Sequence, residues 1–350
     1  MHKQRARGLA HERSECVSAL VALQPIKRGL LVGCTALAAA SCQGRQSAWT
    51  AVGDDAAHIS LLGNIMFAGG AIIFALVVIL TTLAIRGRPN WRGPISNERM
   101  VFWGGVVFPV VTLSALLVYG LLLTGAVGRS SEPSALRIEV TGEQFWWRVH
   151  YPEAEGQPGF ATANEIHIPA GRTVELVLAS PDVIHSFWVP NIAGKLDMVP
   201  GQQNRMVIKA SEPVVARGQC AEFCGVQHAN MSLYLMARTE ADFAGWLAGQ
   251  RAEAARNAET ERGRALFASA GCGGCHAIRG TPARGTIGPD LTHFGGRMSL
   301  AAGMLTNDAA AIARWISGAQ HIKPGNKMPS FGIFNPDDLT ALASYLEGLK

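Results

Sequence analysis

The chain has 350 residues, of which 48% are hydrophobic and 16% are charged, and its formal net charge is +5 at pH 7. This length allows two or more domains, and the high hydrophobic share points to membrane segments. No basic run is interleaved with aromatic residues, so the modest positive charge gives no support for nucleic-acid binding.

Residues 1–41 have the layout of a targeting leader. Residues 1–28 are basic, residues 29–40 form a short apolar run, and small residues precede Cys42. This order is typical of a signal peptide, and it resembles a bacterial lipoprotein cleavage box with Cys42 as the lipidated N-terminus. An uncleaved tail with three unrelated thiols, Cys16, Cys34 and Cys42, is the alternative, and a true start further downstream stays open.

Residues 56–127 predict a transmembrane hairpin. Its two apolar runs, residues 61–85 and 101–127, each exceed the roughly 20 residues that cross a bilayer as a helix. Pro109 is tolerated inside a membrane helix, where neighbours can satisfy the freed carbonyl. The loop between the runs contains one acidic residue, Glu98, against four arginines: Arg86, Arg88, Arg92 and Arg99. Positive loops stay in the cytoplasm, so both flanks are expected outside; a buried soluble hairpin is the alternative.

Residues 134–240 predict a domain of short strands. The β-branched and aromatic runs are 136–140, 146–150, 165–168, 173–178, 206–210 and 233–238, and Pro, Gly and Asn clusters divide them. Many short strands without helices between them predict a sandwich or a barrel.

The stretch from Cys220 to Met231 contains four side chains that can bind a metal: Cys220, Cys224, His228 and Met231. Soft thiolate and thioether ligands select copper, and a structural zinc site has no use for Met. A mononuclear blue-copper site needs one thiolate and two imidazoles, so the second Cys invites a second copper, with both sulfurs bridging. That arrangement requires another His, which His185 supplies. A simple disulfide between Cys220 and Cys224 is the alternative.

Three segments resemble subunit II of haem-copper cytochrome c oxidases: His185 to Pro190, Gly194 to Gly201, and Cys220 to Met231. The resemblance implies a cupredoxin-like barrel that holds a dinuclear copper A centre. The implied ligands are Cys220 and Cys224 as bridges, His185 and His228 as terminal ligands, Met231 as a weak ligand, and the backbone carbonyl of Glu222. Asp197 and Glu222 also match family positions near a magnesium site at the boundary with the partner subunit.

The sequence departs from the family pattern at two places. A Trp usually receives the electron from an external cytochrome, and Phe145 stands at that position, which leaves Trp146 as a second candidate. The neighbouring Trp147 is either core packing or part of this aromatic cluster. Met100 occupies a position where the family often has a carboxylate that feeds protons to subunit I.

Residues 241–258 are rich in Ala, Glu, Arg and Gln and predict a solvated helical linker. After it, Cys272, Cys275 and His276 form the Cys-x-x-Cys-His signature of a covalent c-type haem, with His276 as one axial ligand. A thioredoxin-like pair would need a βαβ context, and half a zinc site lacks a second thiol pair. Residues 259–350 resemble a class I cytochrome c domain.

The second axial ligand has several candidates: Met298, Met304, Met328, His293 and His321. Met328 is preferred because it lies in a Pro- and Gly-containing loop that matches the family's distal segment. The resemblance also implies that the carbonyl of Pro289 orients the proximal imidazole. In the last predicted helix, residues 336–349, four apolar residues form a core-facing stripe.

Taken together, these features predict a multidomain membrane protein with a two-helix hairpin, a cupredoxin-like copper domain and an all-α cytochrome c domain. The resemblance implies subunit II of a respiratory cytochrome c oxidase, in which haem c and the copper pair pass electrons to the haem of subunit I. Oxygen reduction and proton pumping would belong to that partner. Further expected partners are subunit III, an external cytochrome c or other donor, and membrane lipid; the expected location is the bacterial inner membrane, with the copper and haem domains on the extracytoplasmic side.

Other functional classes stay open at this point. One is a membrane-anchored copper-handling protein, and another is a periplasmic electron shuttle outside an oxidase. A quinol oxidase subunit is disfavoured because such relatives lack the copper ligands that this chain retains. Nitrous oxide reductase shares the copper centre but not the membrane spans.

Overall fold

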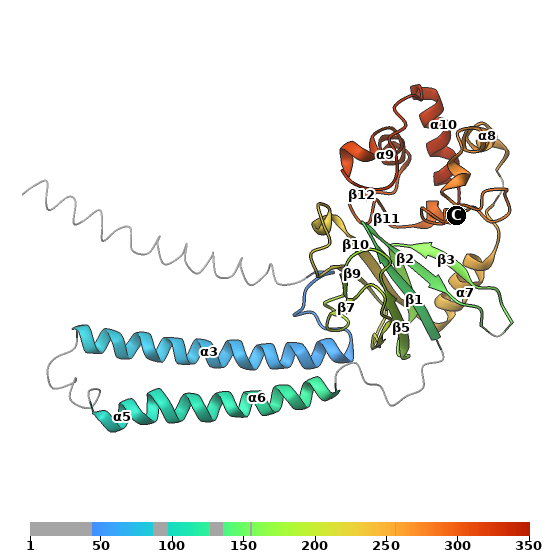
Figure 1. Cartoon of the computed structure of the whole chain (residues 1–350). Coiled ribbons are helices and arrows are strands. Elements are labelled where there is room, and N and C mark those ends of the chain that lie inside the picture. The colour runs from blue at the N-terminus through green and yellow to red at the C-terminus, as the bar shows by residue number, and fades with distance from the viewer. Residues whose placement is uncertain (1–43, 87–96, 127–135, 155, 256) are drawn as a thin grey trace, which may run out of the picture.

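The computed structural model describes residues 44–86, 97–126 and 136–350, apart from the single residues 155 and 256. The predicted leader, with Cys16, Cys34 and Cys42, lies outside these ranges. In chain order the described residues form a helical hairpin, a domain of two β-sheets and a C-terminal domain of helices (Figure 1). The predicted fold class is confirmed.

The hairpin consists of one long helix and one interrupted helix. The first is α3 (Asp54–Arg86), and the second runs through α5 (Glu98–Phe102), a π-helical turn (Trp103–Val107) and α6 (Phe108–Ala126). Pro109 is the second residue after the π-helical turn. Because proline has no N–H to donate to the preceding turn, a local widening of the helix accommodates it.

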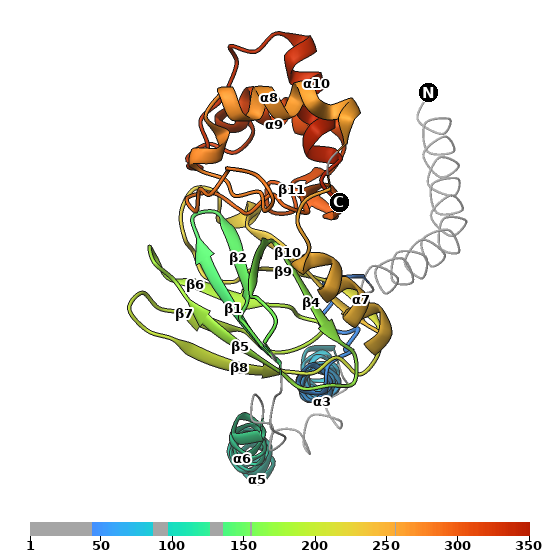
Figure 2. The same ribbon diagram turned by 90° about the vertical axis from the view of Figure 1, so that its right-hand side faces the viewer.

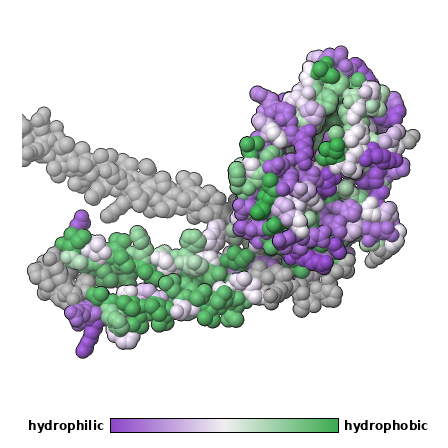
Figure 3. All heavy atoms as spheres, in the orientation of Figure 1, coloured by the Kyte–Doolittle hydropathy of each residue, from purple (hydrophilic) through white to green (hydrophobic). Residues whose placement is uncertain are grey.

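Both arms of the hairpin are long and apolar enough to cross a membrane, and no part of their most apolar stretches is buried inside the protein. A core helix of a soluble protein would be mostly buried. Figure 3 shows the same contrast, with hydrophobic atoms along the hairpin and mostly hydrophilic atoms over the rest of that face. The two arms extend from the same side of the β-sheet domain (Figure 1).

The residues before α3 attach the hairpin to the β-sheet domain. The backbone N–H of Val52 donates to the carbonyl of Asn191 at 2.8 Å, and Asn191 Nδ2 donates to the carbonyl of Thr50 at 2.9 Å. A Cβ atom at Gly53 would lie 2.0 Å from the carbonyl oxygen of Ile192, so only glycine fits there. The hairpin is therefore joined to the sheets by hydrogen bonds as well as by the chain.

The β-domain, residues 136–238, contains two five-stranded sheets with the orders β3-β2-β1-β5-β8 and β4-β10-β9-β6-β7. Each sheet has one parallel pair, β1 with β5 and β4 with β10. Every second residue of β2 is buried (Trp147, Val149 and Tyr151), so that face of the strand supplies the core between the sheets. The strands are β1 Leu136–Glu143, β2 Trp146–Tyr151, β3 Phe160–Ala163, β4 Glu165–Pro169, β5 Val174–Ala179, β6 His185–Trp188, β7 Leu196–Met198, β8 Asn204–Ile208, β9 Val214–Cys220 and β10 Ser232–Arg238.

Helix α7 (Glu240–Arg251) packs against the β-domain, which differs from the solvated linker expected from its composition. Phe243 is buried, and Trp246 stacks on His167 with ring centroids 4.0 Å apart. These two aromatic residues, three positions apart, form one apolar face on an otherwise polar helix. The chain that leads to the C-terminal domain thus starts from a fixed helix.

His167 lies at the centre of a buried polar network under α7. Its Nδ1 accepts a hydrogen bond from Arg238 Nε at 2.8 Å, and its Nε2 faces Glu165 at 3.6 Å. Its backbone N–H and carbonyl both bond the hydroxyl of Tyr151 at 2.8 Å. Burial lowers the pKa of His167, and Glu165 only partly opposes this effect. The network therefore holds a neutral imidazole.

The C-terminal domain, residues 258–350, is built around α8 (Glu261–Ser269), α9 (Ala309–Ile322) and α10 (Pro336–Glu347), which lie together at the far end from the hairpin (Figure 2). A Cβ atom at Gly263 would lie 2.1 Å from the carbonyl oxygen of Ala341, so α8 and α10 cross at backbone contact. Three members of the predicted stripe are buried (Leu342, Ala343 and Leu346), and Leu339 packs at its edge. The short elements are η2 His228–Asn230 in the β-domain and η3 Ala258–Thr260, η4 Cys272–Gly274, η5 Phe294–Gly296, β11 Ser299–Leu300 and β12 Leu305–Thr306 in the C-terminal domain.

Candidate metal centre and cofactor pocket

Strands β6 and β9, neither of which was predicted from the sequence, position the first two metal-binding side chains. His185 begins β6 and Cys220 ends β9, and the two strands pair with Phe187 opposite Cys220. The residues after Cys220 then turn through a short loop before β10 begins. This loop returns Cys224, His228 and Met231 toward His185, so all five side chains meet at one end of the β-domain.

The donor atoms are close to one another. Cys220 Sγ lies 3.9 Å from Cys224 Sγ and 3.8 Å from His185 Nδ1. Cys224 Sγ lies 3.7 Å from His228 Nδ1 and 3.9 Å from Met231 Sδ. A disulfide needs sulfur atoms about 2.05 Å apart, and both thiols are free. The alternative of a simple disulfide is therefore not what the structure contains.

This donor set fits soft metal ions. Ligand atoms that bind one ion at about 2.0 Å (nitrogen) and 2.3 Å (sulfur) in a tetrahedral arrangement are roughly 3.5 to 3.8 Å apart. The observed sulfur and nitrogen separations lie at or just above this range. The backbone carbonyl of Glu222 is 3.1 Å from Cys220 Sγ, so it also reaches the cluster. Two thiolates, two imidazoles, a thioether and a carbonyl are the donor types expected of a copper site.

The electrostatics of the thiol pair favour one thiolate. The hydrogen bond from the Cys224 thiol and the neighbouring His185 hold the pKa of Cys220 well below the usual thiol value, although burial opposes them. The same pairing raises the pKa of Cys224, because two adjacent thiolates would repel. A bound cation would remove this penalty, since metal ligation deprotonates a thiol.

Asp182 orients His185, and sequence reasoning missed it. Asp182 Oδ1 lies 2.9 Å from His185 Nε2, which leaves Nδ1 directed at Cys220. Burial would lower the pKa of His185, but the hydrogen bonds to Cys220 and Asp182 outweigh it and raise that pKa. A Cβ atom at Gly142 would lie 2.9 Å from His185 Cγ, so the opposite side of the ring is closed as well. The sequence signal that could have identified Asp182 is a carboxylate three residues before a candidate histidine ligand.

Trp147 belongs to the core. It is fully buried, and its Nε1 donates to the carbonyl of Met231 at 3.3 Å. Its ring meets Phe187 edge to face at 5.9 Å. Trp147 therefore supports the metal-binding loop from inside the β-domain, whereas Phe145 and Trp146 line a cavity that opens toward the C-terminal domain.

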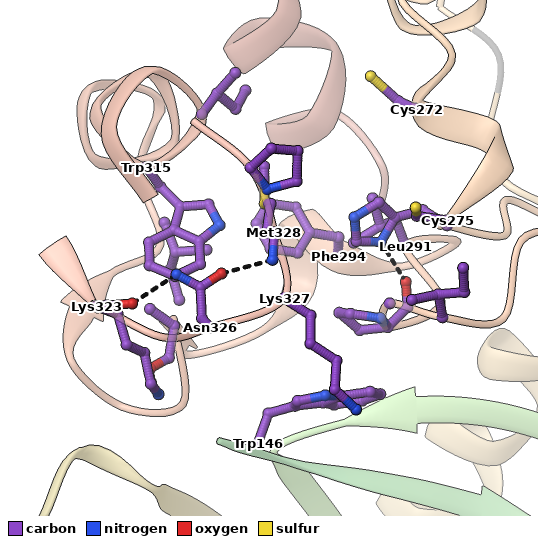
Figure 4. A pocket seen from close by; sticks show the side chains of 18 of the residues that line it. Trp146, Cys272, Cys275, Leu291, Phe294, Trp315, Lys323, Asn326, Lys327 and Met328 are labelled. Atoms are coloured by element: carbon purple, nitrogen blue, oxygen red, sulfur yellow. Dashed lines mark hydrogen bonds between the residues drawn. The ribbon is translucent and has the colours of Figure 1, made fainter. Parts of the chain in front are cut away.

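The haem-type residues of the C-terminal domain line that same cavity. Cys272, Cys275, His276 and Met328 surround a space of about 1190 Å³, mouth included, with mostly apolar walls. Figure 4 shows Met328 among aromatic and aliphatic side chains, with Trp146 of the β-domain facing Lys327 at the cavity edge. The lining suits a large flat apolar molecule.

His276 is held as a neutral imidazole with one nitrogen free. Burial lowers its pKa, and Nδ1 donates to the carbonyl of Pro289 at 2.8 Å, as the resemblance implied. This bond fixes the tautomer that leaves Nε2 without a proton. A Cβ atom at Gly288 would lie 2.5 Å from His276 Cε1, so the loop can approach the ring only because residue 288 is glycine.

The loop that carries Met328 is closed by side-chain hydrogen bonds. Asn326 Oδ1 accepts from the backbone N–H of Met328 at 2.7 Å, and Gln320 Nε2 donates to the carbonyl of Met328 at 2.7 Å. The other candidate axial ligands, Met298, Met304, His293 and His321, do not line the cavity. Of the five candidates, Met328 alone shares the cavity with His276.

Phe145 lies between the two sites. A Cβ atom at Gly225, the residue after Cys224, would lie 3.2 Å from the Phe145 ring, and one at Gly325 would lie 3.8 Å from it. Gly325 belongs to the loop that leads to Met328. Gln144, the residue before Phe145, donates from Nε2 to the carbonyl of Cys224 at 2.5 Å. One aromatic ring therefore contacts both the metal-binding loop and the C-terminal domain.

The predicted magnesium ligands are not brought into a metal cluster. Asp197 is half exposed and pairs with Lys195 at 3.4 Å. Among the described residues, the group of His, Cys, Asp or Glu side chains close enough to hold an ion is His185, Cys220 and Cys224, and it includes neither Asp197 nor Glu222. Magnesium binding stays a prediction.

Comparison with known proteins finds a similar family for each of the two domains. Residues 154–237 match the family model described as the periplasmic domain of cytochrome c oxidase subunit II, and residues 260–350 match that of cytochrome c. Cytochrome c oxidase subunit 2 of Alkalihalophilus pseudofirmus is 42% identical over 216 residues, which are 61% of each chain. The protein of the same name from Bacillus subtilis is 28% identical over 300 residues, 80% of this chain and 83% of that one.

Among solved structures, the periplasmic domain of subunit II of cytochrome oxidase from Bradyrhizobium japonicum is 28% identical, with a TM-score of 0.32. It covers 35% of this chain and 97% of that chain. Within one polypeptide, residues 154–237 are thus similar to the periplasmic domain of cytochrome c oxidase subunit II and residues 260–350 to cytochrome c.

Proposed function

We propose that this chain is subunit II of a membrane-bound respiratory cytochrome c oxidase and that it accepts electrons through its own haem c. When bound, the haem held by Cys272, Cys275, His276 and Met328 and a dinuclear copper A centre held by the β-domain would supply one-electron chemistry, so that this chain would deliver electrons to the haem of subunit I. Subunit I, with subunit III, would reduce oxygen to water and pump protons. An external cytochrome c or another donor would supply the electrons.

The β-domain supports the copper assignment through its donors. Cys220 and Cys224 would bridge the two ions, His185 and His228 would be terminal ligands, and Met231 and the carbonyl of Glu222 would complete the set. His185, Cys220, Cys224 and Met231 are buried and His228 is half-buried. Strands β6 and β9 and the core around Trp147 hold the cluster from two sides. Rigid ligands suit electron transfer, because the geometry then changes little between oxidation states.

The C-terminal domain supports the haem assignment. Cys272 and Cys275 would form the thioether bonds, and His276 and Met328 would be the axial ligands. Methionine ligation raises the potential of the iron. The apolar walls of the cavity have the same effect, since they disfavour the extra charge of the oxidised iron.

The hairpin supports a membrane location. Both arms lack burial in the protein, and both join the β-domain on the same side. With the Arg-rich loop in the cytoplasm, the two redox domains would lie on the extracytoplasmic face of the bacterial inner membrane.

The observation that carries the proposal is the shared position of Phe145. Its ring contacts the loop of Cys224 on one side and the C-terminal domain on the other, and it lines the cavity of His276 and Met328. A carrier protein that only delivers copper has no need for such a junction. The tether between the domains would keep the haem at an effective concentration on the order of millimolar or higher.

Metal and haem analysis of the purified membrane complex tests the proposal. We expect two coppers and one covalent haem per chain, with subunit I present. Cys224→Ser should abolish the copper pair and electron flow to oxygen. Val226→Ala is the matched control, because this side chain in the same loop is 77% exposed and offers no ligand.

Two results would contradict this function. One is a single copper per chain that transfers to an acceptor protein as Cu(I), which indicates copper handling. The other is undiminished oxygen consumption in Cys224→Ser.

A further inference from the structure

Lys323 is a buried lysine of the C-terminal domain that lies against the β-domain. It follows α9 directly and is 2% exposed. Its Nζ donates to the carbonyls of Phe145 at 2.8 Å, Asn230 at 2.7 Å and Ala301 at 3.0 Å. The first two acceptors belong to the β-domain and the third to the C-terminal domain. All three donor hydrogens of the ammonium group are thus used, two of them across the boundary.

This arrangement is unusual for a lysine. Buried lysines normally pair with a carboxylate, and the described part of the chain places no Asp or Glu within ion-pair distance of Lys323. Burial lowers the pKa of Lys323 to about 7, and the nearby Cys224 opposes this shift only in part. A side chain that is costly to bury and bonds both domains indicates a role in the contact between them.

The contact continues on both sides of Lys323. The backbone N–H of Ser232, at the start of β10, donates to the carbonyl of Ala302 at 3.1 Å. Arg148 Nη2 donates to the carbonyl of Thr286 at 2.8 Å, and its guanidinium lies 4.7 Å from the centre of the Trp146 ring. A backbone carbonyl accepts in each of these hydrogen bonds, so the boundary depends on the course of the backbone in both domains.

The C-terminal domain adopts a strained conformation at this boundary. Ala301, Ala302 and Gly303 have φ angles of 57°, 60° and 84°. Two consecutive alanines in the left-handed region are disfavoured because their Cβ atoms crowd the backbone. Their carbonyls are the groups that accept from Lys323 and Ser232. The strained turn therefore presents the Ala302 carbonyl to the β-domain and the Ala301 carbonyl to Lys323, which itself bonds the β-domain.

We propose that Lys323 is an interdomain anchor, a positioning residue whose ammonium group holds the C-terminal domain on the β-domain in one fixed orientation. The anchor bonds the carbonyl of Phe145 itself, so it fixes this residue between Gly225 and the cavity of Met328. The C-terminal domain is thus a docked module and not a tethered shuttle that must find its partner for each electron.

A consequence follows for the external donor, and it rests on the proposed function. The docked C-terminal domain covers Phe145, which is 5% exposed, and bonds the strand end beside it. A diffusing cytochrome cannot reach this surface. It has to deliver its electron to the C-terminal domain.

Hydrogen exchange of the full chain with bound haem and copper tests the anchor. In Lys323→Met, which keeps the apolar stem and removes the donors, the amide of Ser232 should exchange at least about tenfold faster than in the unaltered chain. Lys350→Met is the matched control: it removes the same charge from an exposed position, and the Ser232 amide should exchange as before. The absorption bands of haem and copper report whether each domain of the variant is folded.

Unchanged protection of Ser232 in a folded Lys323→Met chain would overturn the anchor. If Lys323→Met does not fold, the exchange rate of the Ser232 amide is measured in the unaltered chain instead. With the anchor in place, this amide should be as protected as amides of the core. Exchange as fast as at the exposed turn residue Gly201 would refute the anchor. Flash reduction of the haem gives a second readout, because electron transfer to copper should slow in Lys323→Met while both absorption spectra stay the same. Absence of such transfer in the unaltered chain would instead contradict the proposed function and leave the exchange result standing.

Discussion

Replacement of Gly288 by alanine tests how closely the proximal loop holds His276. A Cβ atom at position 288 would lie 2.5 Å from His276 Cε1 and 2.9 Å from Nδ1. Non-bonded carbon atoms pack at about 3.5 to 4.0 Å, so the imidazole has to retreat by roughly 1 Å. The hydrogen bond from Nδ1 to the carbonyl of Pro289 is 2.8 Å long and would pass the limit of about 3.2 Å.

The expected cost follows from that lost bond. An intramolecular hydrogen bond contributes about 0.5 to 1.5 kcal/mol, and a buried group left without a partner costs about 1 to 3 kcal/mol. Gly288→Ala should therefore lower the free energy of unfolding of the C-terminal domain by about 1 to 3 kcal/mol. This change corresponds to a factor of roughly 5 to 150 in the ratio of folded to unfolded chains.

Chemical unfolding of the full chain, followed at the main haem absorption band, measures this change. Covalent attachment through Cys272 and Cys275 should be unaffected, so the haem content stays a constant reference. Gly296→Ala is the matched control, because no heavy atom lies within 4 Å of a Cβ atom at that position. If Gly288→Ala and Gly296→Ala unfold at the same denaturant concentration, the argument from close approach is wrong.

Three further predictions concern the β-domain. His167 is protonated near pH 6.5 in the unfolded chain and only at lower pH in the folded chain. Below pH 6.5 the free energy of unfolding should therefore fall by up to about 1.4 kcal/mol per pH unit. His167→Gln should remove this contribution, as measured by unfolding at a series of pH values. Asp182→Asn removes a negative charge beside His185 and should raise the reduction potential of the copper centre by tens of millivolts, on the order expected for a unit charge several Å away, as measured by voltammetry. Phe145→Leu should cost less than about 1.5 kcal/mol of stability and yet slow haem-to-copper electron transfer in flash experiments, because its ring contacts both loops.

Each of these predictions has a result that contradicts it. An identical slope of stability against pH in His167→Gln would mean that the imidazole is already charged in the folded chain. A potential that does not move in Asp182→Asn would show that this carboxylate contributes nothing to the site. An unchanged rate of haem-to-copper electron transfer in Phe145→Leu would show that the electron does not depend on the Phe145 ring.

The residues of both candidate sites could be grouped from the sequence because most of them are close in the chain. Cys220, Cys224, His228 and Met231 lie on one loop, and the haem signature occupies five consecutive residues. Because these residues are separated by only a few positions, a short loop is enough to bring their side chains together. The distant ligand, His185, needed a chemical argument about the surplus thiolate and a resemblance. Four strands of the β-domain escaped prediction, including β6 and β9, because they are short or interrupted by polar residues and Gly218.

Local sequence thus determined the kinds of elements and the donor atoms: long apolar runs form helices for a membrane, short alternating runs form strands, and closely spaced soft ligands form a metal site. Tertiary structure alone decided what surrounds those donors. Asp182 behind His185, Gly288 against His276, α7 on His167 and Lys323 across the domain boundary all depend on chain segments that meet only after folding. The physical reason for these contacts is burial. When neighbouring groups replace water around a carboxylate, a glycine or a lysine, they determine which bonds and contacts that residue makes.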